Sequence, residues 1–149
     1  MSIGNMVVRL LLAVALGGII GIERETSRKP AGLRTNVLIC VSSAMMMIVA
    51  ELFSAKTGSG EGAMRIAAGV ITGVGFLGAG AIIQARGTIH GLTTASVIWA
   101  VAGLGLAVGA GYYLISIAFT VVVVLILVLL RKIEQMIGDE SKKNPPPVH

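Results

Sequence analysis

The sequence has little charge, few aromatic residues, few prolines and a single cysteine. Only 13% of its 149 residues are charged, whereas soluble domains carry about 25% charged residues. This deficit, together with a hydrophobic content of 55% and a mean hydropathy of +0.91, excludes an ordinary soluble domain and indicates a polytopic membrane protein. Because Cys40 is the only cysteine, an intramolecular disulfide is also excluded. Its place within an apolar run is typical of a small buried side chain.

Five long apolar runs divide the chain. They cover residues 6–22, 37–53, 66–83, 92–110 and 112–130, and a membrane-spanning helix needs about 20 residues. We therefore expect an all-α integral membrane fold with about five transmembrane helices, forming one transmembrane domain over residues 1–137. The polar, proline-containing segment 138–149 is expected to be a disordered cytoplasmic tail, with no C-terminal soluble domain.

The basic residues are distributed unevenly between the two sides of such a five-span chain. One side collects nine of them, and the other collects only Arg9, Lys56 and Arg65. Since cytoplasmic loops carry the excess of Lys and Arg, we place the N-terminus outside and the C-terminus in the cytoplasm. The formal charge of +5 then favours contact with anionic lipid headgroups, and no nucleic-acid-binding pattern is present.

Glycines punctuate the apolar runs at helical spacing. Three Gly-x-x-x-Gly pairs occur, at Gly17/Gly21, Gly69/Gly73 and Gly105/Gly109, and Gly75, Gly78 and Gly80 extend the third run. Such pairs let the backbones of two membrane helices approach closely, so we expect the helices to pack through these faces. An alternative is that residues 75–80 interrupt the helix and expose backbone groups to an ion. The absence of proline from every run argues against a break.

Three polar motifs fall on the side that we predict to be cytoplasmic. Their residues are Glu23, Arg24, Glu25, Arg34, Thr35, Asn36, Arg86, Thr93 and Thr94. Because lone charges are costly at the membrane boundary, we expect Arg24 and Arg34 to pair with Glu23 or Glu25. Thr93 or Thr94 is expected to cap the helix over 92–110, whose N-terminal end would favour an anion. These residues either anchor the interface or form a pocket for an ion, a headgroup phosphate or a partner protein.

Candidates for a metal site, a cofactor site or a catalytic site are few. Two carboxylates among several arginines suit an anion or a salt bridge better than a Mg²⁺ cage, and His90 has no nearby histidine with which to bind a metal. We predict no resident metal, no cofactor and no enzymatic activity, because no nucleophile–base pair or phosphate loop is present. Glu51, at the end of the second run, and Glu23 are the candidates for an ion or proton path.

Four motifs resemble the MgtC/SapB family of bacterial inner-membrane proteins. They are GGIIGIERE at 17–25, AGLRTN at 31–36, GVGFLGAGAI at 73–82 and GLTTASVIW at 91–99. The resemblance implies a helical domain in the bacterial inner membrane, adaptation to low magnesium, survival of pathogens inside host cells and, in some members, restraint of the proton-driven ATP synthase. It marks Glu23, Arg24, Arg34, Thr35, Thr93, Thr94 and Trp99 as important positions, and we group Trp99 with the helix-packing residues. Family members with the best-known virulence role carry a further soluble domain.

Three functions remain open at this point. The first is a regulator that binds a membrane protein partner, and the second is an ion transporter or channel that conducts Mg²⁺ or another cation. Since five spans are few for a pore, the second would need an oligomer, and we expect a homo-oligomer. The third is binding of an anionic lipid headgroup by Arg24, Arg28, Lys29 and Arg34.

Overall fold

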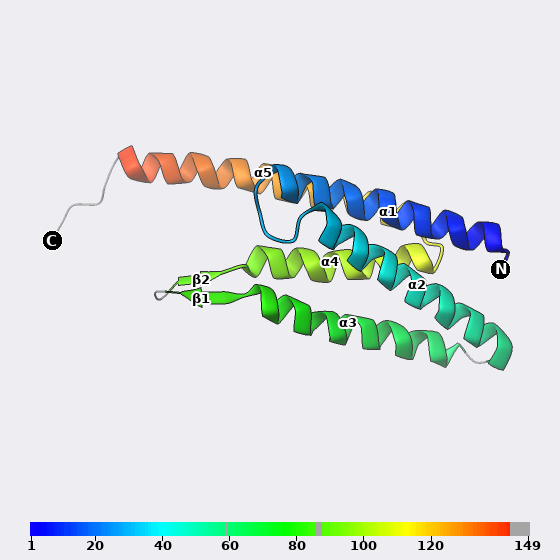
Figure 1. Cartoon of the computed structure of the whole chain (residues 1–149). Helices are drawn as coiled ribbons and strands as arrows, with labels where there is room; N and C mark the ends of the chain where they lie inside the picture. Colours follow the sequence, from blue (N-terminus) through cyan, green and yellow to red (C-terminus); the bar gives the residue numbers. More distant parts are fainter. Residues whose placement is uncertain (59, 86–87, 144–149) are drawn as a thin grey trace.

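The computed structural model describes residues 1–58, 60–85 and 88–143, and these form an elongated bundle of five α-helices with a β-hairpin at one end (Figure 1). The helices are α1 (Ile3–Thr26), α2 (Leu33–Thr57), α3 (Glu61–Ala81), α4 (Leu92–Gly109) and α5 (Tyr113–Lys143), and the strands are β1 (Ile83–Ala85) and β2 (Thr88–His90). We call the end that carries the strands the hairpin end. The opposite end, where the chain begins, is the N-terminal end.

All five helices are long and apolar enough to cross a membrane, which confirms the predicted fold class. The first two helices extend beyond the apolar runs into polar sequence: α1 continues through Glu23, Arg24 and Glu25, while α2 already begins at Leu33. Glutamate and arginine are good helix formers, so the apolar runs alone underestimated the lengths of both helices. Two of the predicted polar motifs consequently lie on the terminal turns of helices.

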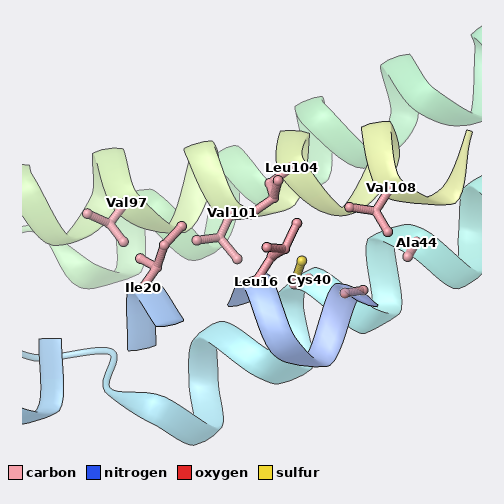
Figure 2. Close-up of a cluster of buried hydrophobic side chains, with 9 residues drawn as sticks. Leu16, Ile20, Cys40, Ala44, Val97, Val101, Leu104 and Val108 are labelled. Carbon is pink, nitrogen blue, oxygen red and sulfur yellow. The ribbon is translucent and has the colours of Figure 1, made fainter. Parts of the chain in front are cut away.

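α4 is the central helix of the bundle. Of its apolar stretch 56% is buried, compared with 17–28% in the other four helices. Its inward face presents Val97, Val101, Leu104 and Val108, which recur at alternating spacings of four and three residues, as expected for one face of a helix. Figure 2 shows these side chains packed against residues of α1 and α2, namely Leu16, Ile20, Cys40 and Ala44. Cys40 is completely buried, as its sequence context predicted.

Four glycines lie where helix backbones approach closely. A Cβ atom built on Gly17 would lie 2.7 Å from Cβ of Cys40, and one on Gly21 would lie 2.7 Å from Cα of Leu33. On α4, a Cβ atom at Gly109 would lie 2.8 Å from Cβ of Met47, and Gly105 is equally crowded by α2. No side chain larger than hydrogen fits these positions at the observed helix spacing.

Other predicted packing glycines have a different environment. A Cβ atom on Gly69, Gly73, Gly75 or Gly80 would meet no described atom within 4 Å, whereas one on Gly78 would make an ordinary contact with Ala95. Trp99 is also exposed, at 53% of its surface. Packing of the whole bundle through Gly-x-x-x-Gly faces therefore stays a prediction. α3 runs without interruption from Glu61 to Ala81, so the predicted alternative of a break at 75–80 does not occur.

The segment between α3 and α4 and the C-terminal segment contain more regular structure than we predicted. The polar break after the third run contains an antiparallel pair in which Gln84 lies opposite Ile89. α5 continues to Lys143, six residues into the segment that we predicted to be disordered. No residue of 138–143 prevents a helix, and the first prolines follow only at 145–147, where the residue before a proline disfavours helical backbone. Residues 144–149 lie outside the described part of the chain.

Candidate functional site

A cavity of about 680 Å³ lies at the hairpin end, between the end of α1, the start of α4 and the middle of α5. Its polar lining consists of Glu23, Arg24, Ser27, Arg28, Lys29, His90, Thr93, Thr94, Arg131 and Glu134. We call it the hairpin-end cavity. It brings together four of the predicted boundary residues, Glu23, Arg24, Thr93 and Thr94, from helices that are far apart in the sequence.

Arg24 is the most buried charged side chain of this cavity. Only 4% of its surface is exposed, and its Nη2 atom donates a hydrogen bond of 3.0 Å to Oγ1 of Thr94, which is itself buried. Its Nε atom is buried and has no hydrogen-bond partner among the described residues. The Arg24–Thr94 bond ties the last turn of α1 to the first turn of α4.

Glu23 belongs to a second group of contacts in the same cavity. Its Oε1 atom accepts a hydrogen bond of 2.7 Å from the Ser27 hydroxyl and lies 3.6 Å from Nη1 of Arg131 on α5. Arg131 also donates to the Ser27 hydroxyl. The other carboxylate oxygen of Glu23, Oε2, is buried and has no hydrogen-bond partner within the described part of the chain. These contacts connect α5 to the end of α1.

Glu25 and Asn36 stabilise the turn between α1 and α2. The Oε2 atom of Glu25 accepts a hydrogen bond of 3.0 Å from the backbone N–H of Leu33, the first residue of α2. Asn36 is completely buried, and its amide donates to the carbonyl oxygens of Ala31 and Gly32. Both side chains satisfy backbone groups at a helix start, and neither lines the hairpin-end cavity.

The prediction that Arg24 and Arg34 pair with Glu23 or Glu25 is wrong. Arg24 donates to Thr94, because successive residues of a helix point in different directions and Glu23 turns toward Ser27 and Arg131. Arg34 is exposed on the first turn of α2, as is Thr35. The side chain of Arg86 lies outside the described residues.

The predicted threonine cap of α4 is also wrong. Gly91 is the N-cap residue, and no side chain within the described ranges makes a capping hydrogen bond there. Gly91 has a φ of +91°, which favours glycine, and a Cβ atom at this position would collide with the carbonyl group of Ala81. Thr94 is turned to Arg24 instead, so the first N–H groups of α4 remain at the cavity.

A second polar cluster lies at the N-terminal end of the bundle. Nη1 of Arg9 lies 2.6 Å from Oε2 of Glu51, its Nε atom donates a hydrogen bond of 3.3 Å to the Tyr113 hydroxyl, and Nη1 also donates to the carbonyl of Gly109. This one side chain therefore joins α1 to α2, α4 and α5. Glu51 and Glu23, the two candidates for an ion path, thus lie at opposite ends of the bundle and are both engaged.

Sequence reasoning missed three of these residues as members of a site. Arg9 was visible as a lone cation within an apolar run, and such a charge requires a partner, but nothing in the sequence pointed to Glu51. Arg131 was visible only as a basic residue that follows an apolar run. Ser27 gave no signal. Within the described residues, no group of three His, Cys, Asp or Glu side chains is placed to hold a metal ion.

Comparison with known proteins gives a consistent set of matches. The model of the MgtC family matches residues 10–136. The Salmonella typhimurium protein MgtC is 37% identical over 131 residues, covering 88% of this chain and 54% of the relative. YhiD of Escherichia coli, whose name proposes a magnesium transporter, is 45% identical over 122 residues, covering 79% and 57%. An uncharacterised Haemophilus influenzae protein is 39% identical over 141 residues, covering 91% and 59%.

The chain thus spans 54–59% of the length of these relatives. No solved structure matches it.

Proposed function

Because this chain belongs to the MgtC family of membrane proteins, we propose that it is a non-enzymatic regulator that binds a membrane protein partner. The partner that the family resemblance favours is the proton-driven ATP synthase, and the setting is adaptation of a bacterium to low magnesium. The observation that carries this proposal is the outward face of α3, which is open in the described chain and suited to a helix of another protein.

The outward face of α3 is built from glycines that the bundle does not use. A Cβ atom built on Gly69, Gly73 or Gly80 would meet no atom of the described residues within 4 Å, while Val74 and Gly78 are the buried residues of this helix. In a membrane, small residues at this spacing allow a second helix to approach closely and gain van der Waals contacts. An isolated α3 face would offer lipid only an uneven surface. The face therefore favours a protein neighbour.

Two apolar grooves flank the same helix. One, of about 310 Å³, lies between α2 and α3 and is lined by Ser43, Met46 and Val70 among others. The other, of about 420 Å³, lies between α3 and α4 beside Trp99. Side chains of a partner helix that crosses the glycine face would enter these grooves, and this adds shape specificity to the contact.

We also propose an orientation in the bacterial inner membrane. The hairpin end carries the cavity residues Arg24, Arg28, Lys29 and Arg131, and the positive-inside rule assigns such an end to the cytoplasm. The N-terminus is then outside and the C-terminus inside. The partner contact along α3 lies within the membrane, where a subunit of the ATP synthase is accessible.

The experiment compares two substitutions of a small residue by leucine. Gly73→Leu obstructs the outward face of α3 without a clash inside the chain, and Ala118→Leu makes a similar change at an exposed position on α5. Inverted membrane vesicles that contain the chain are assayed for ATP-driven proton pumping, and proteins that co-purify with the chain are identified. We expect Gly73→Leu to abolish both the effect on pumping and partner capture, while Ala118→Leu retains both. Full activity of Gly73→Leu would contradict the proposal.

The second candidate function is an oligomeric cation transporter or channel, which the name of the Escherichia coli relative favours. It requires carboxylates on the path, and Glu51 and Glu23 are the available candidates. Proteoliposomes that contain only this chain provide the test, with flux of Mg²⁺, K⁺ and protons measured beside Glu51→Gln and Glu23→Gln. Flux that either variant removes would establish this function, and crosslinking between copies in the same liposomes would identify the homo-oligomer that it needs.

A further inference from the structure

We propose that the hairpin-end cavity binds a phosphate group, held by the guanidinium groups of Arg24 and Arg131 and by the first backbone N–H groups of α4. This inference does not depend on the regulatory role proposed above. The ligand that the cavity would recognise is the negatively charged phosphate group, which phospholipid headgroups and free phosphate have in common.

The first observation is the unpaired state of Arg24. Only 4% of the surface of Arg24 is exposed. Among the described residues no carboxylate oxygen lies within 4.0 Å of it, and one neutral hydroxyl group is its hydrogen-bond partner. A buried charge without an ionic partner is strongly destabilising. An anion in the cavity would provide the missing partner, including for the unpartnered Nε atom.

The second observation is the start of α4, which opens onto the same cavity. The first hydrogen bond of the helix runs from the N–H of Ala95 to the carbonyl of Gly91, so the N–H groups of Leu92, Thr93 and Thr94 precede the helical ladder. In the described chain no side chain caps them. A helix N-terminus carries a partial positive charge and free donors, which together favour a phosphate.

The third observation is the charge of the whole cavity. Its basic side chains are Arg24, Arg28, Lys29 and Arg131, whereas its carboxylates are Glu23 and Glu134, and His90 is the remaining titratable group. Glu23 is close enough to influence Arg24 electrostatically, but its Oε1 atom is engaged by Ser27 and Arg131. The cavity therefore keeps a surplus of positive charge, which selects an anionic ligand.

The source of the phosphate follows from the other wall of the cavity. Ile126, Leu127 and Leu130 of α5 line it, and they belong to the most apolar span of the chain. A basic wall facing an aliphatic wall at a membrane boundary suits a phospholipid, whose headgroup would lie at Arg24 and whose acyl chain would follow α5. Free phosphate would use the basic wall alone.

The test measures binding to the purified full chain by native mass spectrometry and by titration. The probes are phosphatidylglycerol, diacylglycerol of the same acyl chains, and inorganic phosphate. The variants are Arg24→Gln and Arg131→Gln in the cavity, with Arg34→Gln as a matched control, because Arg34 is exposed at the same end outside the cavity. Thermal melting of each variant identifies those that fold.

We expect Arg24→Gln and Arg131→Gln to weaken binding of the phosphate-containing probe at least about tenfold, as the loss of a charge-assisted hydrogen bond predicts, with Arg34→Gln unchanged. If Arg24→Gln does not fold, Arg131→Gln decides alone. Binding of phosphatidylglycerol but not inorganic phosphate identifies a lipid site, and binding of inorganic phosphate identifies a free-phosphate site. Equal binding of diacylglycerol, equal loss in Arg34→Gln, undiminished binding in folded cavity variants, or binding of neither phosphate probe would overturn the proposal.

Discussion

Replacing Gly105 by alanine should separate α2 from α4, and the size of the effect follows from the structure. A Cβ atom on Gly105 would lie 2.7 Å from Cβ of Ser43 and 3.0 Å from the carbonyl carbon of Cys40. Carbon atoms in good contact lie about 3.5–4.0 Å apart, so the two helices would have to move apart by about 1 Å. The backbone of α2 is the obstacle, and it cannot rotate out of the way as a flexible side chain can.

The cost of this movement is that of an overpacked core. The cluster of Figure 2 surrounds the contact, and a shift of α4 would loosen Val101, Leu104 and Val108 against α1 and α2. Overpacking costs about 1–3 kcal/mol, which for a chain of this length lowers the melting temperature by about 3–10 °C. Gly103→Ala on the same helix is the control, because a Cβ atom there meets none of the described atoms within 4 Å.

The single cysteine provides the assay for this pair of variants. Cys40 is completely buried in the cluster where α1, α2 and α4 meet, so a maleimide dye that fluoresces on coupling to a thiol reports when this cluster opens. On heating in detergent, Gly105→Ala should label at a lower temperature than the unsubstituted chain, and Gly103→Ala should label at the same temperature or a higher one. If both variants melt with the unsubstituted chain, or if Gly103→Ala is equally destabilised, the close-approach argument is refuted.

Two further predictions concern the N-terminal end and the topology. Glu51→Gln and Arg9→Met should be coupled by about 0.5–3 kcal/mol in a double-mutant cycle of thermal stability, because the two side chains form one ion pair at 2.6 Å; additive effects would show that the pair contributes nothing. A membrane-impermeant maleimide added to intact spheroplasts should label Ser2→Cys and leave Lys132→Cys unlabelled, since Ser2 caps the start of α1 at the N-terminal end and Lys132 follows Arg131 of the hairpin-end cavity. The reverse pattern would invert the proposed orientation.

The fold was largely predictable from the sequence because a bilayer imposes simple requirements on the chain. Length and hydropathy were sufficient to identify five spans. Glycine spacing singled out Gly105 and Gly109, where a Cβ atom would collide with α2. The same spacing did not distinguish them from Gly69 and Gly73, which face open space in the described chain. Whether a glycine faces a neighbouring helix depends on how its own helix is rotated about its axis. The spacing of glycines within one helix does not tell where the next helix lies.

The sequence indicated which polar residues of the candidate site lie on the same side of the chain, but it did not indicate which hydrogen bonds and ion pairs they form. Topology predicted that Glu23, Arg24 and Thr94 lie on the same side of the chain, and in the structure all three line the hairpin-end cavity. The partners were not predictable, because the hydrogen bond between α1 and α4 and the ion pair between α1 and α5 join residues that are 70 or more positions apart, and they depend on how these helices pack. Charge balance allowed several pairings, and geometry selected Arg24–Thr94 and Glu23–Arg131.

The contacts of Arg9 have a consequence for the order in which the protein is assembled during its synthesis. Glu51 follows Arg9 by 42 residues, and the carbonyl of Gly109 follows it by 100. At a translation rate of about 5–20 residues per second, the carboxylate emerges about 2–8 s after the arginine and the carbonyl only after about 5–20 s. Glu51 of α2 can therefore neutralise Arg9 of α1 before α4 is made. When the end of α4 is inserted, the carbonyl of Gly109 meets an arginine side chain that Glu51 already holds in place.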